Sequence, residues 1–358
     1  MILSGSLGLG HHVVAEVVAG SLARLGWQSR TLDCMGLLGP RGAHAGNRMF
    51  RWLMSAPGAY DALYFGQLRP GRRVARAMEG AALSRLLPRL RSELRERPAE
   101  LVIAVFATGA SAVPGLAQSV PGLRTVVLCP DAAPHSTWVP DGVDLFLVTS
   151  EAAAASVRRY RPRARISIVP PPVRPAFFHP RSQAEAREAL AIPADARCVL
   201  LMGGGWGLGP VEDAARALTD AGVHVLAVAG HNRRLAGRLQ AVQRTDARLH
   251  AFGLTQDVAG LMTAADLVVT LPGAATCWEA RAAGRRLVLL DAMPGHGREN
   301  VQRELEAGGA DVCTPRSPDL VAGILAALDR DQRSRADRRP ALPWHTAFEA
   351  ALASIGVG

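Results

Sequence analysis

Apolar residues along the chain come in short unbroken runs, and each run is followed by a longer Ala-, Leu- and Arg-rich segment of helical character. LVIAVFA (101–107), TVVLC (125–129) and LFLVTS (145–150) are such runs, flanked by turn-forming residues. Continuous apolar runs are typical of strands that are covered on both faces, as in a parallel sheet between two layers of helices. The pattern therefore predicts an α/β fold.

A second series of the same kind follows the first. ISIVPPPV (166–173) ends the first series in three prolines, which neither a helix nor a central strand accommodates. The later runs are CVLLMGGG (198–205), VHVLAVAG (223–230), LHAFG (249–253), DLVVTL (266–271) and RLVLLD (286–291). Two series of similar size predict two doubly wound, Rossmann-like domains, residues 1–172 and 173–338, that face one another across a cleft.

Two further segments stand apart from these series. Residues 339–358 follow a charged stretch, and we expect them to form a closing helix that packs back on the first domain. Residues 46–78 mix aromatic residues and Met with Arg and are broken by two prolines. They form either an irregular helical insertion on the core or an amphipathic lid that touches a membrane or an apolar acceptor, with Arg on the headgroups.

The net charge narrows the range of expected partners only moderately. The 358 residues are 49% hydrophobic and 20% charged, which suits a globular protein, and the net charge is +10 with arginine as the sole basic residue type apart from histidine. A basic chain is compatible with phosphate-bearing partners or an anionic membrane surface. Nucleic acid is not an expected partner, because the arginines form no dense stripe with stacking aromatics and only 5% of residues are aromatic.

The cysteines and the first residues bear on the compartment. Five cysteines are scattered without a CxxC pair, as in a reduced protein with buried thiols. The chain opens on MILSGS, already strand-like and without an apolar leader, and no run approaches ~18 apolar residues. We expect a cytoplasmic protein, peripheral on the inner face of the cell membrane if the 46–78 segment binds lipid.

Two glycine-rich turns are candidates for ligand binding. The first strand leads into SGSLGLGHH, where a helix is expected to start near His11, and a helix N-terminus favours an anion or a polarised hydroxyl. His11 is either a capping residue or a catalytic one. MGGGWGLGP (202–210) opens the second domain, and its glycines Gly203, Gly204 and Gly205 predict close approach to phosphate. A dinucleotide site is disfavoured, because the next strand ends AVAGHNRR without an acid.

TLPGAATCWEARAAG (270–284) predicts a strand, a small-residue turn and a helix. Gly273, Ala274, Ala275 and Thr276 would form a diphosphate cradle at the helix N-terminus. Glu279, expected on the first turn, would accept the two ribose hydroxyls. The alternative is a Thr276–Glu279 capping box, and spacing does not decide between the two.

The loop VVLCPDAAPHSTWVP (126–140) delivers an acid, an imidazole and an indole at the carboxyl end of a predicted strand, where open α/β sheets bind ligands. These residues are Asp131, His135 and Trp138. The loop is therefore predicted to form one wall of a binding site.

In this order the motifs resemble the monogalactosyldiacylglycerol synthase-like branch of the GT-B glycosyltransferases, which includes diacylglycerol glucosyltransferases and is related to the peptidoglycan N-acetylglucosaminyltransferase. The likeness covers nearly the whole chain. The motifs that carry it are GLGHHVVA, APGAYDALY, the D-x-x-x-H-x-x-W loop at 131–138, ISIVPPPVRPAF, LLMGGGWGLG, AGHNRRL, LMTAADLVVTLPGAATCWEA and MPGHGREN.

The resemblance implies a role for each motif residue. His11 and Asp131 would be catalytic, and His135 and Trp138 would bind the acceptor. The nucleotide sugar would be bound by Gly203, Gly204, Gly205, Gly273, Ala274, Ala275, Thr276, Glu279, His296 and Asn300. His296 stands where the family has Gln, and Gly297 where it has an acid, so the resemblance leaves the transferred sugar open.

The implied activity is transfer of a hexose from a UDP-sugar to a hydroxyl of a lipid acceptor such as diacylglycerol, with inversion, without a metal and without a cofactor. Either His11 or Asp131 would be the base; we favour His11, with Asp131 as its partner. The alternatives are a soluble secondary metabolite as acceptor and an inactive nucleotide-sugar-binding protein.

Overall fold

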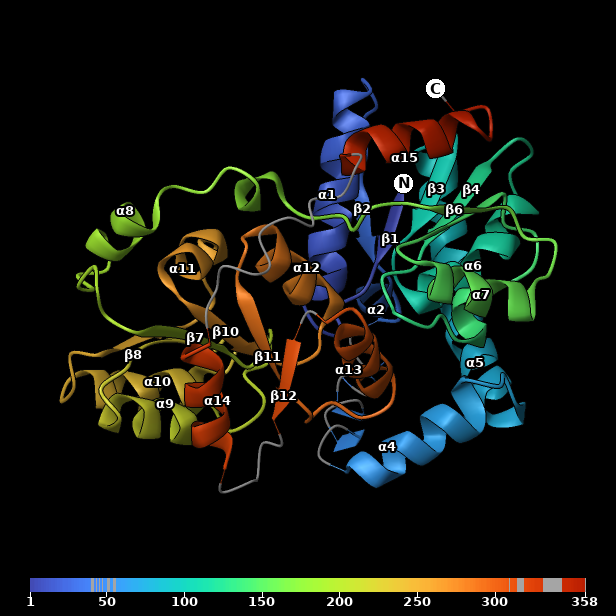
Figure 1. Ribbon diagram of the computed structural model, residues 1–358. Helices are drawn as coiled ribbons and strands as arrows, with labels where there is room; N and C mark the ends of the chain where they lie inside the picture. Colours follow the sequence, from blue (N-terminus) through green and yellow to red (C-terminus); the bar gives the residue numbers. More distant parts are fainter. Residues whose placement is uncertain are drawn as a thin grey trace. The chain divides into compact units, whose positions relative to one another are not determined.

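The computed structural model describes residues 1–39, 42, 44, 46, 48–49, 52–53, 56–308, 310–313, 319–330 and 343–357. The chain divides into two compact units. Unit 1 comprises Met1–Pro172, Pro294–His296 and Pro340–Gly358, and unit 2 comprises Val173–Met293 and Gly297–Arg339. Each unit holds one six-stranded parallel sheet with helices packed on it (Figure 1).

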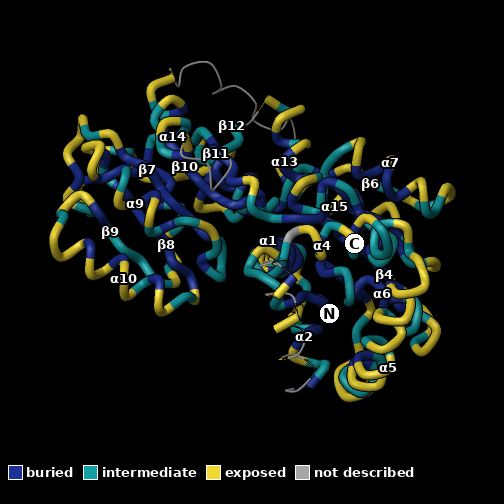
Figure 2. Tube along the Cα trace, turned by 90° about the horizontal axis from the view of Figure 1, so that it is seen from below, coloured by how far each residue is buried: buried dark blue, intermediate teal, exposed yellow. Residues whose placement is uncertain are grey.

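The sheet of unit 1 has the order β2-β1-β3-β4-β5-β6. Its strands are β1 (Ile2–Ser4), β2 (Thr31–Asp33), β3 (Leu101–Ala104), β4 (Arg124–Leu128), β5 (Leu145–Val148) and β6 (Ile166–Ile168). Every residue of β1, β3 and β5 is buried, as expected for strands covered on both faces. Figure 2 shows the same contrast between buried strands and the exposed outer turns of helices.

The helices of unit 1 include one long element and several short ones. They are α1 (Gly10–Arg24), α2 (Cys34–Leu37), α4 (Pro57–Leu63), α5 (Arg73–Glu96), α6 (Ala107–Ala117), α7 (Glu151–Tyr160) and α15 (Trp344–Ala353). A π-helical turn at Tyr64–Leu68 follows α4, and a 3₁₀ turn lies at Ser136–Trp138. The last helix, α15, packs on α1, because the buried Trp344 Nε1 donates to Ser21 Oγ at 2.8 Å.

The sheet of unit 2 has the order β12-β11-β10-β7-β8-β9. Its strands are β7 (Cys198–Met202), β8 (His224–Val228), β9 (Leu249–Phe252), β10 (Leu267–Thr270), β11 (Arg286–Leu290) and β12 (Ala310–Cys313). Its helices are α8 (Gln183–Glu188), α9 (Val211–Asp220), α10 (Arg233–Gln243), α11 (Val258–Ala264), α12 (Ala274–Ala282), α13 (His296–Glu306) and α14 (Leu320–Leu328). The predicted doubly wound α/β class is confirmed for both sheets.

Two strands were not predicted from the sequence pattern. Thr31–Asp33 and Ala310–Cys313 form β2 and β12 at sheet edges and contain polar or half-buried residues. An edge strand has only one neighbour and does not need a continuous apolar run.

The 46–78 segment is described in part. Residues 47, 50, 51, 54 and 55 lie outside the described residues, and so do 309, 314–318 and 331–342 of the later predicted segments. From Ala56 onward the segment is helical and contains α4, the π-helical turn and the start of α5. In the part of the chain that is described, none of the helices combines the length and the apolar character that crossing a membrane requires.

Candidate functional site

In each sheet the strand order changes direction at one point, and ligands of open α/β sheets bind beyond the carboxyl ends of the strands there. In unit 1 this point lies between β1 and β3, and in unit 2 between β7 and β10. His11 follows β1, and Gly203 and Gly273 follow β7 and β10. The predicted site residues therefore lie at the carboxyl ends of the strands where the topology favours ligand binding.

His11 lies in the first turn of α1. Its Nδ1 is 2.8 Å from the carbonyl oxygen of Val105, which follows β3. A carbonyl only accepts hydrogen bonds, so Nδ1 carries the hydrogen in the neutral ring and Nε2 keeps its lone pair. The capping interpretation of His11 is wrong, because the N-cap residue is Leu9 and no side chain caps the helix.

The surroundings of His11 keep its ring neutral. Burial lowers the pKa of His11 below its ordinary value of 6.5, and the opposing influence of the Asp131 charge is the smaller one. The ring packs edge-on against Phe106, with centroids 5.1 Å apart. A neutral imidazole with a lone pair on Nε2 has the form that a general base requires.

Asp131 is held by Trp138. The buried indole donates Nε1–H to Asp131 Oδ2 at 2.8 Å, from a 3₁₀ turn seven residues further along. The indole ring centroid lies 6.0 Å from that of His11. The structure thus brings together three of the four residues expected at the acceptor: His11, Asp131 and Trp138.

His135 completes the group. Burial is the main reason that its pKa is lowered to about 4, so the ring is neutral at pH 7. Within the described residues its buried Nδ1 has no hydrogen-bond partner. The ring meets the edge of Tyr64, with centroids 5.8 Å apart. His135 therefore keeps one buried ring nitrogen without a hydrogen-bond partner in the described part of the chain, at the wall of the site.

The structure brings His296, which we expected among the nucleotide-sugar residues, beside the acceptor residues of unit 1. Residues Pro294–His296 belong to unit 1, and His296 Nδ1 lies 3.3 Å from the hydroxyl of Tyr60. Gly295 N–H donates to Asp61 Oδ1 at 2.7 Å. Tyr60 and Asp61 of α4 thus hold this segment in unit 1. Such contacts join residues far apart in the sequence, so the sequence alone did not indicate them.

Sequence reasoning missed Tyr60, Tyr64 and Arg69 as parts of the site. Both tyrosines are buried beside His296, and Arg69 Nη1 donates to the carbonyl of Pro134 at 2.7 Å, which braces the loop of Asp131 and His135. The two tyrosines lie in the motif APGAYDALY, for which we predicted no role, and Arg69 was indicated only by its position in the 46–78 segment.

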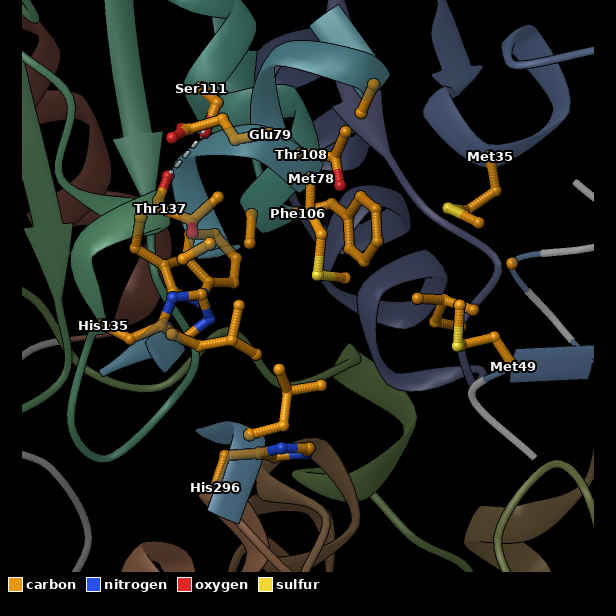
Figure 3. A pocket seen from close by; sticks show the side chains of 18 of the residues that line it. Met35, Met49, Met78, Glu79, Phe106, Thr108, Ser111, His135, Thr137 and His296 are labelled. Carbon is orange, nitrogen blue, oxygen red and sulfur yellow. Dashed lines mark hydrogen bonds between the residues drawn. The ribbon is translucent and has the colours of Figure 1, made fainter. Parts of the chain in front are cut away.

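One cavity of unit 1, with a volume of about 360 Å³, is lined by His11, Tyr60, Asp131, His135, Trp138 and His296. Figure 3 shows His135 and His296 at one end of it, with Phe106, Met78, Met35 and Met49 along its walls. Most of the lining is aliphatic or aromatic. A mostly apolar cavity with a few convergent polar groups is the usual form of a small-molecule site.

In unit 2 the glycines after β7 are required by the loop itself. A Cβ on Gly203 would lie 2.6 Å from the carbonyl oxygen of Leu208, and one on Gly207 would lie 2.4 Å from that of Ala229. Gly204 has a positive φ of 64°. Packing alone thus explains Gly203, contrary to the sequence argument, and Gly205 contributes a carbonyl that accepts from His231 N–H.

The N-terminus of α12 has the form expected of an anion site. The helix begins at Ala274, and no side chain caps it. Within the described residues no acceptor is recorded for the backbone N–H groups of Ala274, Ala275 and Thr276, and a Cβ on Gly273 would meet open space. The capping-box interpretation of Thr276 is wrong, because Gly273 is the N-cap residue.

Glu279 lies beyond the first turn of α12 and is almost fully buried. Its Oε1 accepts from Arg174 Nε at 2.8 Å. The guanidinium of Arg174 lies over the ring of Phe177, 5.1 Å from its centroid. The carboxylate predicted to hold a ribose is thus fixed in place by a cation that the sequence did not indicate.

Asn300 is buried, and its Nδ2 donates to the carbonyl of Pro272 at 2.9 Å. It braces the turn that leads into α12. Packing also requires a glycine at position 297, because a Cβ there would lie 2.5 Å from the Cβ of Met293. The absence of an acid at position 297 therefore has a steric reason.

Comparison with known proteins identifies the fold. Residues 208–340 match the glycosyltransferase family 28 C-terminal domain. The crystal structure of Acinetobacter baumannii MurG is similar over 98% of this chain and 97% of its own, with a TM-score of 0.59 and 18% identity. Arabidopsis thaliana UGT89C1 complexed with UDP is similar over 99% and 98%, with a TM-score of 0.65 and 16% identity. The chain has the GT-B glycosyltransferase fold.

Part of the chain is also similar in sequence to proteins named monogalactosyldiacylglycerol synthases. It is 30% identical over 213 residues to a probable monogalactosyldiacylglycerol synthase of Glycine max, which is 56% of this chain and 40% of that protein. The corresponding protein of Nicotiana tabacum is 32% identical over 213 residues, or 56% and 39%. The matches span about two fifths of the length of these relatives.

Proposed function

We propose that the chain is an inverting hexosyltransferase that moves a sugar from a UDP-sugar to a hydroxyl of a lipid-like acceptor, without a metal ion. The observation that carries this proposal is the neutral His11, with its Nε2 lone pair available, at the wall of an apolar cavity. The similarity to proteins named monogalactosyldiacylglycerol synthases supports the acceptor class.

On the acceptor side, His11 Nε2 would take the proton from the attacking hydroxyl. The imidazolium formed in this step is stabilised by the negative charge of Asp131, which already favours the protonated ring electrostatically. Trp138 holds that carboxylate in place. Asp131 thus acts as the partner of the base, and the oxygen of the acceptor attacks the anomeric carbon as the bond to the diphosphate breaks.

On the donor side, the leaving diphosphate gains negative charge. The open N–H groups of Ala274, Ala275 and Thr276 would stabilise it, and each preorganised donor of this kind typically contributes about 3 kcal/mol to the transition state. Asn300 fixes the turn that aims these groups, and Glu279, oriented by Arg174, would accept the ribose hydroxyls. These groups take the part that a metal ion has in other transferases.

The walls of the cavity support the proposal of a lipid-like acceptor. Met35, Met78 and Phe106 provide apolar contact, while exposed Trp52 and Phe65 lie in the 46–78 segment nearby in the sequence. Aromatic residues and arginines together are suited to a membrane interface. We therefore propose a peripheral enzyme on an anionic membrane surface, in the cytoplasm.

The proposal is tested by measuring UDP release from UDP-glucose, UDP-galactose and UDP-N-acetylglucosamine with the acceptor present. Replacing His11 with Gln should lower turnover by about 10²–10⁴-fold, as for the loss of a general base. In the parent protein the acid limb of the pH–rate profile should lie below pH 6.5, because burial lowers the pKa of His11.

The neighbouring His12→Gln variant is the matched control, since His12 bonds Ser4 and does not line the cavity. Equal turnover of His11→Gln and the parent protein would exclude His11 as the base.

A further inference from the structure

The cavity of unit 1 has a second polar group, on the opposite side from His296. Glu79 of α5 lines it together with Thr108 and Ser111 of α6. Figure 3 shows Glu79 beside Ser111, on the opposite side of the cavity from His296. None of these three residues has a part in the proposed transfer.

Glu79 is bound on one side only. Its Oε1 contacts the hydroxyl of the buried Ser111, which also lies 3.0 Å from the carbonyl oxygen of Thr137. Among the described residues no arginine or histidine forms an ion pair with Glu79, and no hydrogen bond is recorded for its Oε2 or for the Thr108 hydroxyl. The carboxylate therefore has an accepting oxygen to spare at the cavity wall.

An apolar ligand would leave this carboxylate in a poor environment. When a ligand displaces water from a cavity, a polar group that the ligand does not bind loses its hydrogen bonds without replacement. A ligand that presents a hydrogen-bond donor to Glu79 avoids that cost. Sites built in this way reject analogues that lack the donor.

We propose that the acceptor carries, besides the hydroxyl that receives the sugar, a second hydrogen-bond donor, which binds Glu79. The donor is a hydroxyl or a protonated amine, and Glu79 determines specificity for it. This inference rests on the proposed function. A diacylglycerol has one free hydroxyl and cannot supply the second donor, so an acceptor with two donors is preferred over it.

The size of the cavity is consistent with a compact acceptor. Its volume of about 360 Å³ lies near the lower end of the range of roughly 300–1,000 Å³ found for small-molecule sites. One acyl chain with a small polar head suits such a space better than two chains.

A purely structural role for Glu79 makes a different prediction. Ser111 contacts the carbonyl of Thr137, next to Trp138, which holds Asp131. If Glu79 only supported this turn, its loss would lower kcat equally for all acceptors. A role in specificity changes the ratio of kcat/KM between acceptors that differ only in the second donor.

The experiment uses the full chain and three short-chain acceptors: a 1-monoacylglycerol, its 2-O-methyl ether and its 2-amino analogue. The ether keeps the reacting primary hydroxyl and lacks the second donor. The parent protein should prefer the diol and the amine to the ether in kcat/KM by about 10- to 100-fold, the value of a hydrogen bond to a charged group. A ratio near one in the parent protein would overturn the inference.

Replacing Glu79 with Ala should reduce this ratio to about one, mainly by lowering kcat/KM for the diol. Glu96→Ala is the matched control, because Glu96 is an exposed residue of the same helix that accepts from Ser92. An unchanged ratio in Glu79→Ala, or an equal loss with all three acceptors, would contradict a role in specificity.

Calorimetric titration of the same acceptors, without a sugar donor, separates the two proposals. Preferential binding of the diol without any transfer would support the role of Glu79 and count against the transferase. Transfer without any preference in rate or binding would support the transferase and count against the role of Glu79.

Discussion

A histidine that burial keeps neutral couples the site to the stability of the fold. His135 has its pKa lowered from 6.5 to about 4, first by burial and further by the charges of His296 and Arg69, while Asp131 opposes the change. Between these two pH values the unfolded chain binds a proton that the folded protein does not. The free energy of unfolding must therefore fall as the pH falls through this window.

We predict that lowering the pH from 6.5 to 4 removes up to about 3 kcal/mol of stability through His135 alone, at roughly 1.4 kcal/mol per pKa unit. Urea unfolding of the parent protein and of His135→Gln at several pH values measures this contribution. The variant should show a weaker pH dependence, and the exposed His179→Gln serves as the control. Equal slopes for the parent protein and His135→Gln would contradict this assignment.

At the scale of elements, α12 combines an open N-terminus with a buried acid on its second turn. Glu279 is paired with Arg174, so the effect of removing it has two sources: a lost ligand contact and an unpaired cation. Breaking a buried ion pair by removing one partner costs about 3–5 kcal/mol, and less when the residue left unpaired is Arg174, which is partly exposed. The two effects are separable by changing each partner in turn.

We predict that Glu279→Gln weakens UDP binding by about tenfold or more, the value of a charged hydrogen bond, while Arg174→Met has a smaller effect on UDP and a larger effect on stability. Calorimetric titration with UDP and thermal unfolding of both variants provide the two measurements. Loss of UDP affinity in Arg174→Met but not in Glu279→Gln would contradict the assignment of the ribose contact to Glu279.

The order of elements was largely predictable, and the site was predictable in part. Ten of the strands follow apolar runs or the strand-like start of the chain because a doubly covered strand must be apolar along its whole length, whereas the edge strands β2 and β12 need not be. Asp131 and Trp138 were found because a strand end precedes them. Tyr60, Arg174 and Glu79 were not, since their contacts join distant parts of the chain.

At the scale of the whole molecule, charge and exposed apolar side chains point to a surface partner. The net charge of +10 attracts anionic surfaces over a distance of about 10 Å at moderate salt. Met49, Trp52, Phe65, Val74 and Met78 are five of the large hydrophobic residues that are exposed among the described ones, and all lie in the 46–78 segment. Arg72, Arg73 and Arg76 are exposed in the same segment.

We predict binding to vesicles that contain an anionic phospholipid, with an affinity that declines as salt rises. Co-sedimentation of the full chain with neutral and with anionic vesicles tests this. Phe65→Ala should weaken binding, and Phe178→Ala is the matched control, because the two phenylalanines are 44% and 41% exposed. Binding that is absent at low salt, or that both substitutions weaken equally, would argue against the 46–78 segment as the membrane contact.

The sequence by itself determined the α/β class, the two series of strands and the turns at which site residues lie, because burial on two faces imposes an apolar run and a strand end imposes a turn. Only the tertiary structure decided which of those residues meet. It placed His296 beside Tyr60, paired Glu279 with Arg174 and brought Glu79 to the cavity of His11. Such pairs depend on how helices pack across sheets, and no local pattern of residues records that packing.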